Sequence, residues 1–133
     1  MIGIDTNVLA RSILNDDEEQ TPLAKQKIRE LINLEGVFIS SYTLVELVWI
    51  MTIKKKNKKD IILVLKSLLE TKGIFIGREN CVRKAVTLFE SGKADFCDYL
   101  IYSEAQEEKV KKIKTFDKNF SKDLEDYVKL LKE

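Results

Sequence analysis

Short apolar runs alternate along this chain with longer segments in which apolar residues recur at helical spacing. The clearest runs are Ile2 to Ile4, Val37 to Ile39 and Ile74 to Ile76, each closed by a polar residue or glycine. The segments between them are long enough for helices of about ten to fifteen residues with one apolar face. This alternation is typical of a parallel sheet with helices on both faces. We therefore predict a three-layer α/β/α domain with a central, mainly parallel sheet.

Capping residues predict where the helices begin, and two further runs at 112–115 and 127–131 predict additional strands. The predicted helix starts are Thr21 with Pro22, Ser40 or Ser41, Asp60, Asn80 and Asp95. At 133 residues and 15.4 kDa, the chain has the size of one domain, so we expect residues 1–133 to fold together. No apolar run approaches the ~20 residues of a membrane span. Since no basic and apolar leader precedes the first run, we expect a cytoplasmic protein without a membrane partner.

The absence of histidine excludes most hydrolytic mechanisms. With no His in the chain, a Ser-His-Asp triad, a Cys-His pair and a His-containing zinc site are all impossible. Cys81 and Cys97 have neither the spacing nor the number for a thiolate metal site, so we expect two small core side chains in a reducing compartment. Chemistry must therefore depend on carboxylates, lysines or a cofactor.

Five carboxylates occupy positions where an open parallel sheet places its functional crevice, beyond the carboxyl ends of the strands. They are Asp5, Glu46, Asp95, Asp98 and Asp117. Each has an ordinary explanation as a helix cap, a turn residue or a solvated position. Glu46 fits that explanation least well, because its neighbours are apolar. Its carboxylate is expected either to leave the helix through a gap or to meet a charged partner.

Carboxylates that converge without histidine repel one another unless a cation joins them. Mg²⁺ or Mn²⁺ is the natural cation, since both accept oxygen ligands and leave positions open for water. Such a metal activates water and neutralises a phosphoryl oxygen, so the leading chemistry is metal-dependent hydrolysis of a phosphodiester.

Four segments carry these acids: MIGIDTNVLAR at 1–11, SYTLVEL at 41–47, ADFCDYLI at 94–101 and TFD at 115–117. Together they resemble the signature segments of PIN-domain ribonucleases, and the likeness is greatest to VapC-type toxins of toxin-antitoxin pairs. They occur in the order and spacing of that family, over essentially the whole chain. The resemblance implies a single PIN-like nuclease domain that cleaves RNA by in-line attack of water and leaves a 5′-phosphate.

The same resemblance implies a role for each acid. Asp5, Glu46, Asp98 and Asp117 correspond to the acidic quartet, with Asp5 and Asp98 as direct Mg²⁺ ligands and Asp95 as an accessory acid. Glu46 and Asp117 would bind metal-held water or a second metal, and either could assist in deprotonating the attacking water. Asn7 and Thr115 correspond to polar residues that orient the carboxylates. Tyr99 departs from the family, in which a small residue usually follows the third acid, and is expected either to narrow the groove or to shift substrate choice without affecting the metal ligands.

The resemblance also implies an RNA substrate, a cognate antitoxin and a homodimer. The segment 42–53 has Glu46 as its one charge, so the helix there is either buried between the core and the next helix or part of a protein interface. By resemblance it helps to form the groove for the antitoxin, whose basic side chain would enter the carboxylate cluster. A dense basic block could guide RNA phosphates, although a solvated loop is its simpler interpretation. The block comprises Lys54, Lys55, Lys56, Lys58 and Lys59.

Two other classes of function compete with the nuclease. A phospho-acceptor domain also gathers aspartates at strand ends, but it needs an acidic pair after the first strand and an Asp after the third. Here Asp5 stands alone and Gly77 follows Ile76. The other class is a catalytically silent α/β domain that binds protein or nucleic acid partners, and the presence of all four acids argues against it.

Overall fold

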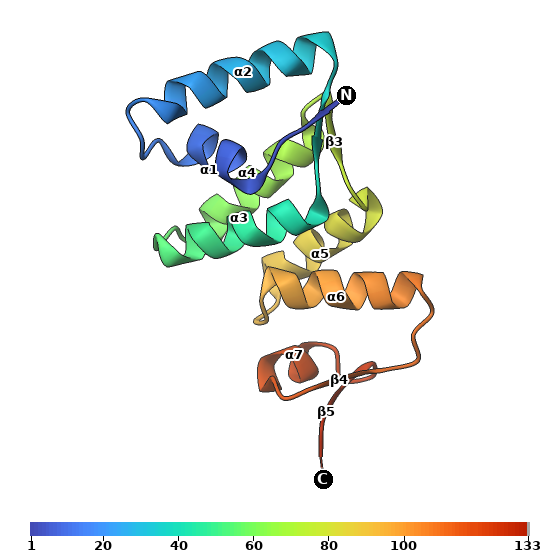
Figure 1. Ribbon diagram of the computed structural model, residues 1–133. Helices are drawn as coiled ribbons and strands as arrows, with labels where there is room; N and C mark the ends of the chain where they lie inside the picture. Colours follow the sequence, from blue (N-terminus) through green and yellow to red (C-terminus); the bar gives the residue numbers. More distant parts are fainter. Residues whose placement is uncertain (133) are drawn as a thin grey trace. The chain divides into compact units, whose positions relative to one another are not determined.

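The computed structural model describes residues 1–132, which form two compact units, Met1–Glu79 and the residues from Asn80 onward. Each unit has its own small sheet, with three strands in the first and two in the second (Figure 1). Every strand pairing among the described residues is parallel, as the alternating pattern predicts.

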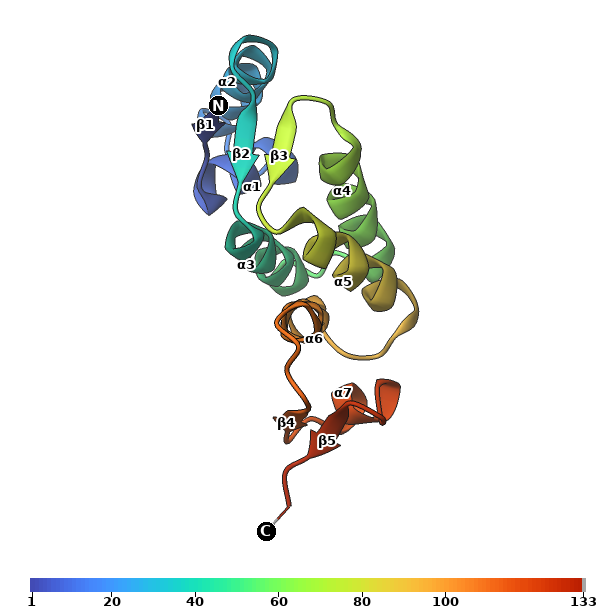
Figure 2. The same cartoon turned by 90° about the vertical axis from the view of Figure 1, so that its right-hand side faces the viewer.

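The first unit is built around the strand order β1-β2-β3, and its strands lie side by side in Figure 2. The strands are β1 (Ile2–Gly3), β2 (Val37–Ile39) and β3 (Ile74–Ile76). Four helices belong to this unit: α1 (Thr6–Leu14), α2 (Gln20–Leu34), α3 (Ser41–Ile53) and α4 (Lys58–Glu70). Helix α1 packs on α2 and α3, and α4 packs on β3. The carboxyl end of β1 therefore leads directly into a helix that contacts α3.

The register of the strands separates the core from the surface. Val37, Ile39 and Ile76 are buried on one face of the sheet. Phe38 and Phe75 are partners in register on the opposite face and remain partly exposed. Side chains alternate between the faces of a strand, so one short apolar run supplies both groups. A helix-ending turn precedes β2, where Gly36 adopts φ 85° and its N–H donates to the Leu31 carbonyl at 2.7 Å.

The second unit contains α5 (Glu79–Ser91), α6 (Phe96–Glu107), β4 (Ile113–Thr115), α7 (Lys118–Asp123) and β5 (Val128–Leu130). Helix α5 begins at the last residue of the first unit. Helix α7 packs on both β4 and β5. The buried residues of α6 are Phe96, Tyr99, Leu100 and Ser103, at the spacing of a single helical stripe.

Three helices begin earlier than their predicted caps. Asn57 caps α4 by accepting a hydrogen bond from the Asp60 N–H at 2.8 Å, so Asp60 lies inside the helix. Helix α2 begins at Gln20, whose N–H donates to Asp17 Oδ1 at 2.7 Å. Pro22 then falls in the first turn, where a missing N–H costs little. Asn80 is the second residue of α5, not its cap. The starts at Ser40 and Asp95 are confirmed.

Helix α3 combines the two environments that its composition left open. Leu44, Leu47 and Val48 are buried, whereas Tyr42 and Trp49 are exposed to solvent.

The α/β fold class is confirmed by the helices and parallel strands of the two units. None of the helices described within residues 1–132 is both long and apolar enough to cross a membrane.

Candidate active site

Asp5 lies at the carboxyl end of β1 and is the N-cap residue of α1. Its Oδ1 accepts a hydrogen bond from the Val8 N–H at 3.1 Å, which explains why the helix begins immediately after the strand. The side chain is exposed. Its Oδ2 has no partner among residues 1–132, so one carboxylate oxygen is fixed by the backbone and the other is available to a ligand.

Glu46 is held by a neutral group. The Thr6 hydroxyl donates to Glu46 Oε1 at 2.6 Å, which joins the first residue of α1 to the second turn of α3 across forty positions of sequence. The charged partner considered from the sequence is not found in the described part of the chain. A hydroxyl satisfies one oxygen without neutralising the charge, so Glu46 keeps its second oxygen for another ligand.

Thr6 is the orienting residue that sequence reasoning missed in this unit. The side chain of Asn7, which was expected to orient a carboxylate, makes no hydrogen bond within residues 1–132 and instead lines a pocket of about 370 Å³ with Asp5. That pocket lies between α1 and α2, and Arg11 and Lys27 also line it. The signal for Thr6 was its position directly after Asp5, at the start of a helix.

In the second unit, Asp95 and Asp98 share the first turn of α6. Asp95 is the N-cap residue, and its N–H donates to Asp98 Oδ2 at 3.3 Å. Asp95 is exposed, and Asp98 is half-buried. A carboxylate in the first turn of a helix is stabilised by the helix dipole, so both positions suit an acid even without a ligand.

Asp117 follows β4 and caps α7. The Phe120 N–H donates to Asp117 Oδ1 at 3.0 Å, and the Asp117 N–H donates to the Thr115 hydroxyl at the same distance. Thr115 therefore holds the backbone of Asp117 and not its carboxylate, so the role expected for it in orienting that carboxylate stays a prediction. The carboxylate is exposed, and its Oδ2 has no partner within the described chain.

The three acids of the second unit influence one another. Partial burial raises the pKa of the Asp98 carboxyl above its ordinary value, and the charges of Asp95 and Asp117 raise it further, against the lowering effect of the hydrogen bond from Asp95. The start of α6 and the end of β4 thus bring these three carboxylates within electrostatic range. The structure places Asp5 and Glu46 together in the first unit, and Asp95, Asp98 and Asp117 together in the second. Their convergence into a single basin stays a prediction.

Two residues of the third signature segment differ from their expected places. Cys81 is buried as expected, but Cys97 is exposed, because it lies off the buried stripe of α6. The thiol is nevertheless partly screened from water. This partial burial and the neighbouring charges of Asp98 and Asp95 raise the pKa of the Cys97 thiol. Tyr99 does not line a groove. Only 1% of it is exposed, and its hydroxyl donates to the carboxylate of Asp123, an exposed residue at the end of α7.

The basic block at 54–59 is partly neutralised. Lys54 Nζ lies 2.9 Å from Asp16 Oδ2, and Arg11 pairs with the same carboxylate at 3.2 Å. The hydrogen bond from Lys54 lowers the pKa of Asp16. Lys58 and Lys59 belong to the first turn of α4 and not to a loop. A contact between this block and RNA stays a prediction.

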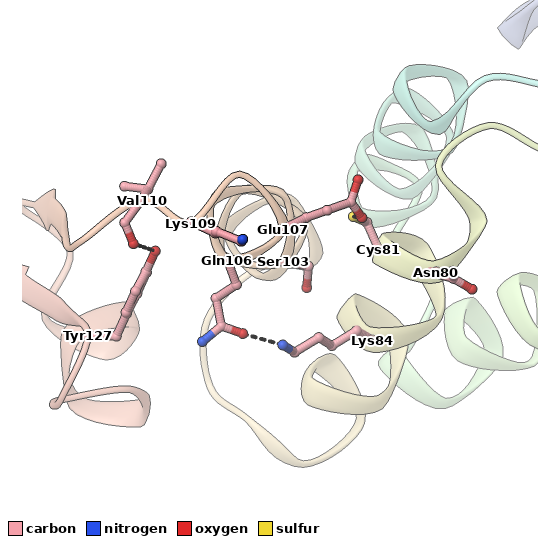
Figure 3. A pocket seen from close by; sticks show the side chains of 9 residues that line it. All are labelled: Asn80, Cys81, Lys84, Ser103, Gln106, Glu107, Lys109, Val110 and Tyr127. Atoms are coloured by element: carbon pink, nitrogen blue, oxygen red, sulfur yellow. Dashed lines mark hydrogen bonds between the residues drawn. The ribbon is translucent and has the colours of Figure 1, made fainter.

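A separate pocket of about 550 Å³ lies at the other end of α6, and several of its polar groups already have partners (Figure 3). Cys81 Sγ donates to Glu107 at 3.0 Å, Lys84 donates to Gln106, and the Tyr127 hydroxyl donates to the Val110 carbonyl. Lys84 also lies over the Tyr102 ring, 5.3 Å from its centroid. These contacts join α5, α6 and the chain after α6, so we assign them to the stability of the second unit.

The comparison with known families decides the class of protein. The model of the PIN domain matches residues 2–122, which span both units and include all five acids. The chain belongs to the PIN domain family. No curated protein and no solved structure matches it. PIN domains are generally nucleases, so membership in this family supports a hydrolase with a nucleic acid substrate.

PIN nucleases typically use divalent metals, and the donor set here fits such an ion. Asp5, Glu46, Asp98 and Asp117 each use one oxygen in a hydrogen bond, and none forms an ion pair within residues 1–132. All of these donors are oxygens, as Mg²⁺ prefers. Within neither unit, over the described residues, do three or more acidic or thiol groups come close enough to hold an ion.

Proposed function

We propose that this PIN domain is a Mg²⁺-dependent endoribonuclease. The observation that carries the proposal is the state of its acidic quartet. Four carboxylates are each fixed through one oxygen and carry no neutralising side chain within the described chain. Charges kept unpaired at such positions are suited to a cation, because mutual repulsion otherwise destabilises them.

The roles of the residues follow the resemblance of their segments to those of PIN-domain ribonucleases, and their hydrogen bonds are compatible with these roles. Asp5 and Asp98 would hold the metal, with Asp95 as an accessory acid. When bound, Mg²⁺ supplies charge neutralisation at the phosphoryl group and activation of water. Glu46 and Asp117 would accept the proton of the attacking water, and Thr6 and Thr115 would keep these two acids in place. A single hydrogen bond to each carboxylate leaves the second oxygen free for that task.

The test compares RNA cleavage with Mg²⁺ or Mn²⁺ and with chelator, in the native protein and in Asp5→Asn and Asp98→Asn. Asparagine retains the capping oxygen, so both variants are expected to fold but to lose metal-dependent cleavage. Asp60→Asn is the matched control, because Asp60 is an exposed acid in the first turn of α4. Fragments should carry 5′-phosphates. Native protein that binds RNA without cleaving it would instead support a silent binding domain, and phosphate incorporation from a small donor would support a phospho-acceptor.

We also propose that the nuclease acts as a toxin with a cognate antitoxin and forms a homodimer. The exposed aromatic side of α3 supports a protein partner, since Tyr42 and Trp49 are 68% and 65% exposed. A basic antitoxin side chain would bind the unpaired carboxylates. Expression should arrest growth in native form and not as Asp98→Asn. Light scattering should report a dimer that Trp49→Lys weakens. Monomeric native protein would contradict the dimer.

A further inference from the structure

We infer that the second unit binds the phosphate backbone of single-stranded RNA in a lysine groove formed by β4, β5 and α7. This groove, of about 840 Å³, is lined by one acid, Glu125, and by six lysines. The lysines are Lys112, Lys114, Lys118, Lys122, Lys129 and Lys132. The inference extends the proposed nuclease, because it assigns the surface that holds its substrate.

The register of the small sheet creates the centre of the groove. Lys114 and Lys129 are partners on neighbouring parallel strands, so their side chains leave the same face of the sheet. Like charges directly opposite each other destabilise a sheet. The preceding residue on each strand, Ile113 or Val128, faces the other way, and Val128 is fully buried. The apolar face thus forces both lysines outward together.

The cations of the groove are largely unpaired. No ion pair involves any of its six lysines within residues 1–132, where only the Lys112 side chain donates a hydrogen bond, to the Asp126 backbone carbonyl at 2.9 Å. Lys118 and Lys122, from α7, are exposed and lie one helical turn apart. Unpaired ammonium groups gathered on one surface are the electrostatic footprint of a polyanion.

Two observations favour RNA over an acidic protein segment. Phe116 is 80% exposed and lies between β4 and Asp117, where an exposed aromatic ring can stack on a base. The strand that carries Lys114 also ends at Thr115, which holds the candidate catalytic Asp117 through its backbone. A phosphate chain bound along β4 would therefore lead toward one of the proposed catalytic acids.

The test measures binding of a short fluorescein-labelled single-stranded RNA by anisotropy, in chelator to prevent cleavage and at several salt concentrations. The variant replaces Lys114, Lys118, Lys122 and Lys129 with Gln. If each lysine contacts one phosphate, we expect affinity to fall about tenfold or more and the salt slope to fall by about three, at ~0.7 per contact. Removing the opposed Lys114 and Lys129 charges should not impair folding, which circular dichroism checks. Single Lys114→Gln and Lys129→Gln variants should show intermediate losses.

The control replaces Lys25, Arg29, Lys66 and Lys72 with Gln, which changes net charge equally in the other unit at positions outside the basic block. Equal losses in both variants, or none in the groove variant, would overturn the inference. Groove-dependent binding of a poly-glutamate peptide without groove-dependent binding of RNA would also overturn it. Cleavage is measured separately with Mg²⁺. Native protein that binds RNA through the groove without cleaving it would contradict the proposed nuclease and leave the groove supported.

Discussion

The Tyr99 hydroxyl donates a hydrogen bond to the Asp123 carboxylate, which joins the first turns of α6 to the end of α7. Asp123 Oδ2 also accepts hydrogen bonds from the N–H groups of Lys93 and Ala94, at 2.7 and 3.2 Å. One carboxylate oxygen therefore holds both the tyrosine and the loop that enters α6. Because that loop ends at Asp95, the contact positions the acids at the start of the helix.

Tyr99→Phe should lower the free energy of unfolding by about 1–3 kcal/mol, since it removes a buried hydrogen bond to a charged group. The matched control is Tyr102→Phe. The Tyr102 ring packs edge-on against Tyr127, with 5.2 Å between centroids. Its hydroxyl makes no hydrogen bond in the described residues, so the control should change stability by less than about 0.5 kcal/mol. Urea titration measures both, and equal effects would contradict the role of the Tyr99 hydroxyl.

The Tyr99–Asp123 pair predicts that stability is lost in two pH ranges, an alkaline limb and an acid limb of the pH profile. Burial, followed by the hydrogen bond to Asp123, raises the pKa of Tyr99 to about 12. A phenol whose pKa is higher in the folded state contributes stability below about pH 10, which is lost as pH rises toward about 12. Partial burial raises the pKa of Asp123, but the hydrogen bonds from Tyr99, Lys93 and Ala94 outweigh it and lower the pKa overall.

Asp123 therefore contributes stability above its unfolded pKa, and this contribution is lost as pH falls through its folded value. Tyr99→Phe should remove the alkaline limb and weaken the acid limb, whereas Asp123→Asn should weaken both. Thermal unfolding across the pH range measures the two limbs. A Tyr99→Phe profile parallel to that of the native protein would show that the pair does not cause them.

Gly92→Ala should destabilise the second unit strongly. A Cβ at this position would lie 1.8 Å from Tyr99 Oη and 2.9 Å from Asp123 Oδ2. Overpacking of this kind costs about 1–3 kcal/mol or more. Gly3→Ala is the control, because its nearest neighbour would be Phe38 Cδ2 at 4.0 Å. Combining Gly92→Ala with Tyr99→Phe should recover part of the loss, since the closest atom is removed; strictly additive losses would exclude the clash as the cause.

Thr6→Val should reduce Mg²⁺-dependent cleavage by about 10- to 100-fold, the usual cost of losing a group that orients a metal-site carboxylate. The physical reason is that Glu46 loses its one hydrogen-bond donor. Thr6→Ser keeps the hydroxyl and should retain most of the activity. Cleavage rates over a Mg²⁺ titration, with circular dichroism as a check of folding, separate the variants. If Ser and Val behave alike, the hydroxyl has no orienting role.

The sequence predicted the elements whose signals are local. The apolar runs that begin at Val37 and Ile74 became strands, and Ser40 and Asp95 capped their helices. Helix starts failed where an earlier side chain took the capping role, as Asn57 did ahead of Asp60. A capping residue is defined by the hydrogen bond it accepts, and several polar residues in a row can compete for it.

The candidate site shows the same limit at longer range. Four of the five acids could be selected because each follows a strand or lies at the start of a helix, and Glu46 stood out because its neighbours are apolar. Thr6 could not be paired with Glu46, because that contact depends on how α1 packs against α3. Cys97 was placed in the core because an unpaired cysteine is usually a small buried side chain, but it lies off the buried stripe of α6. The lysine groove escaped notice because its residues are scattered between 112 and 132 and meet only through parallel pairing of β4 and β5.

The acidic side chains both accept hydrogen bonds at helix starts and supply the proposed chemistry. This limits which substitutions can inactivate the protein in experiments that capture bound RNA. Asp5, Asp98 and Asp117 each accept a backbone hydrogen bond at the start of a helix. Substitution by alanine would remove the hydrogen bond at the start of the helix as well as the carboxylate. A loss of function could then come from either change. Replacement by asparagine removes the charge but keeps an oxygen that can accept the backbone hydrogen bond at the start of the helix. It is therefore the appropriate substitution for trapping an intact RNA on this chain.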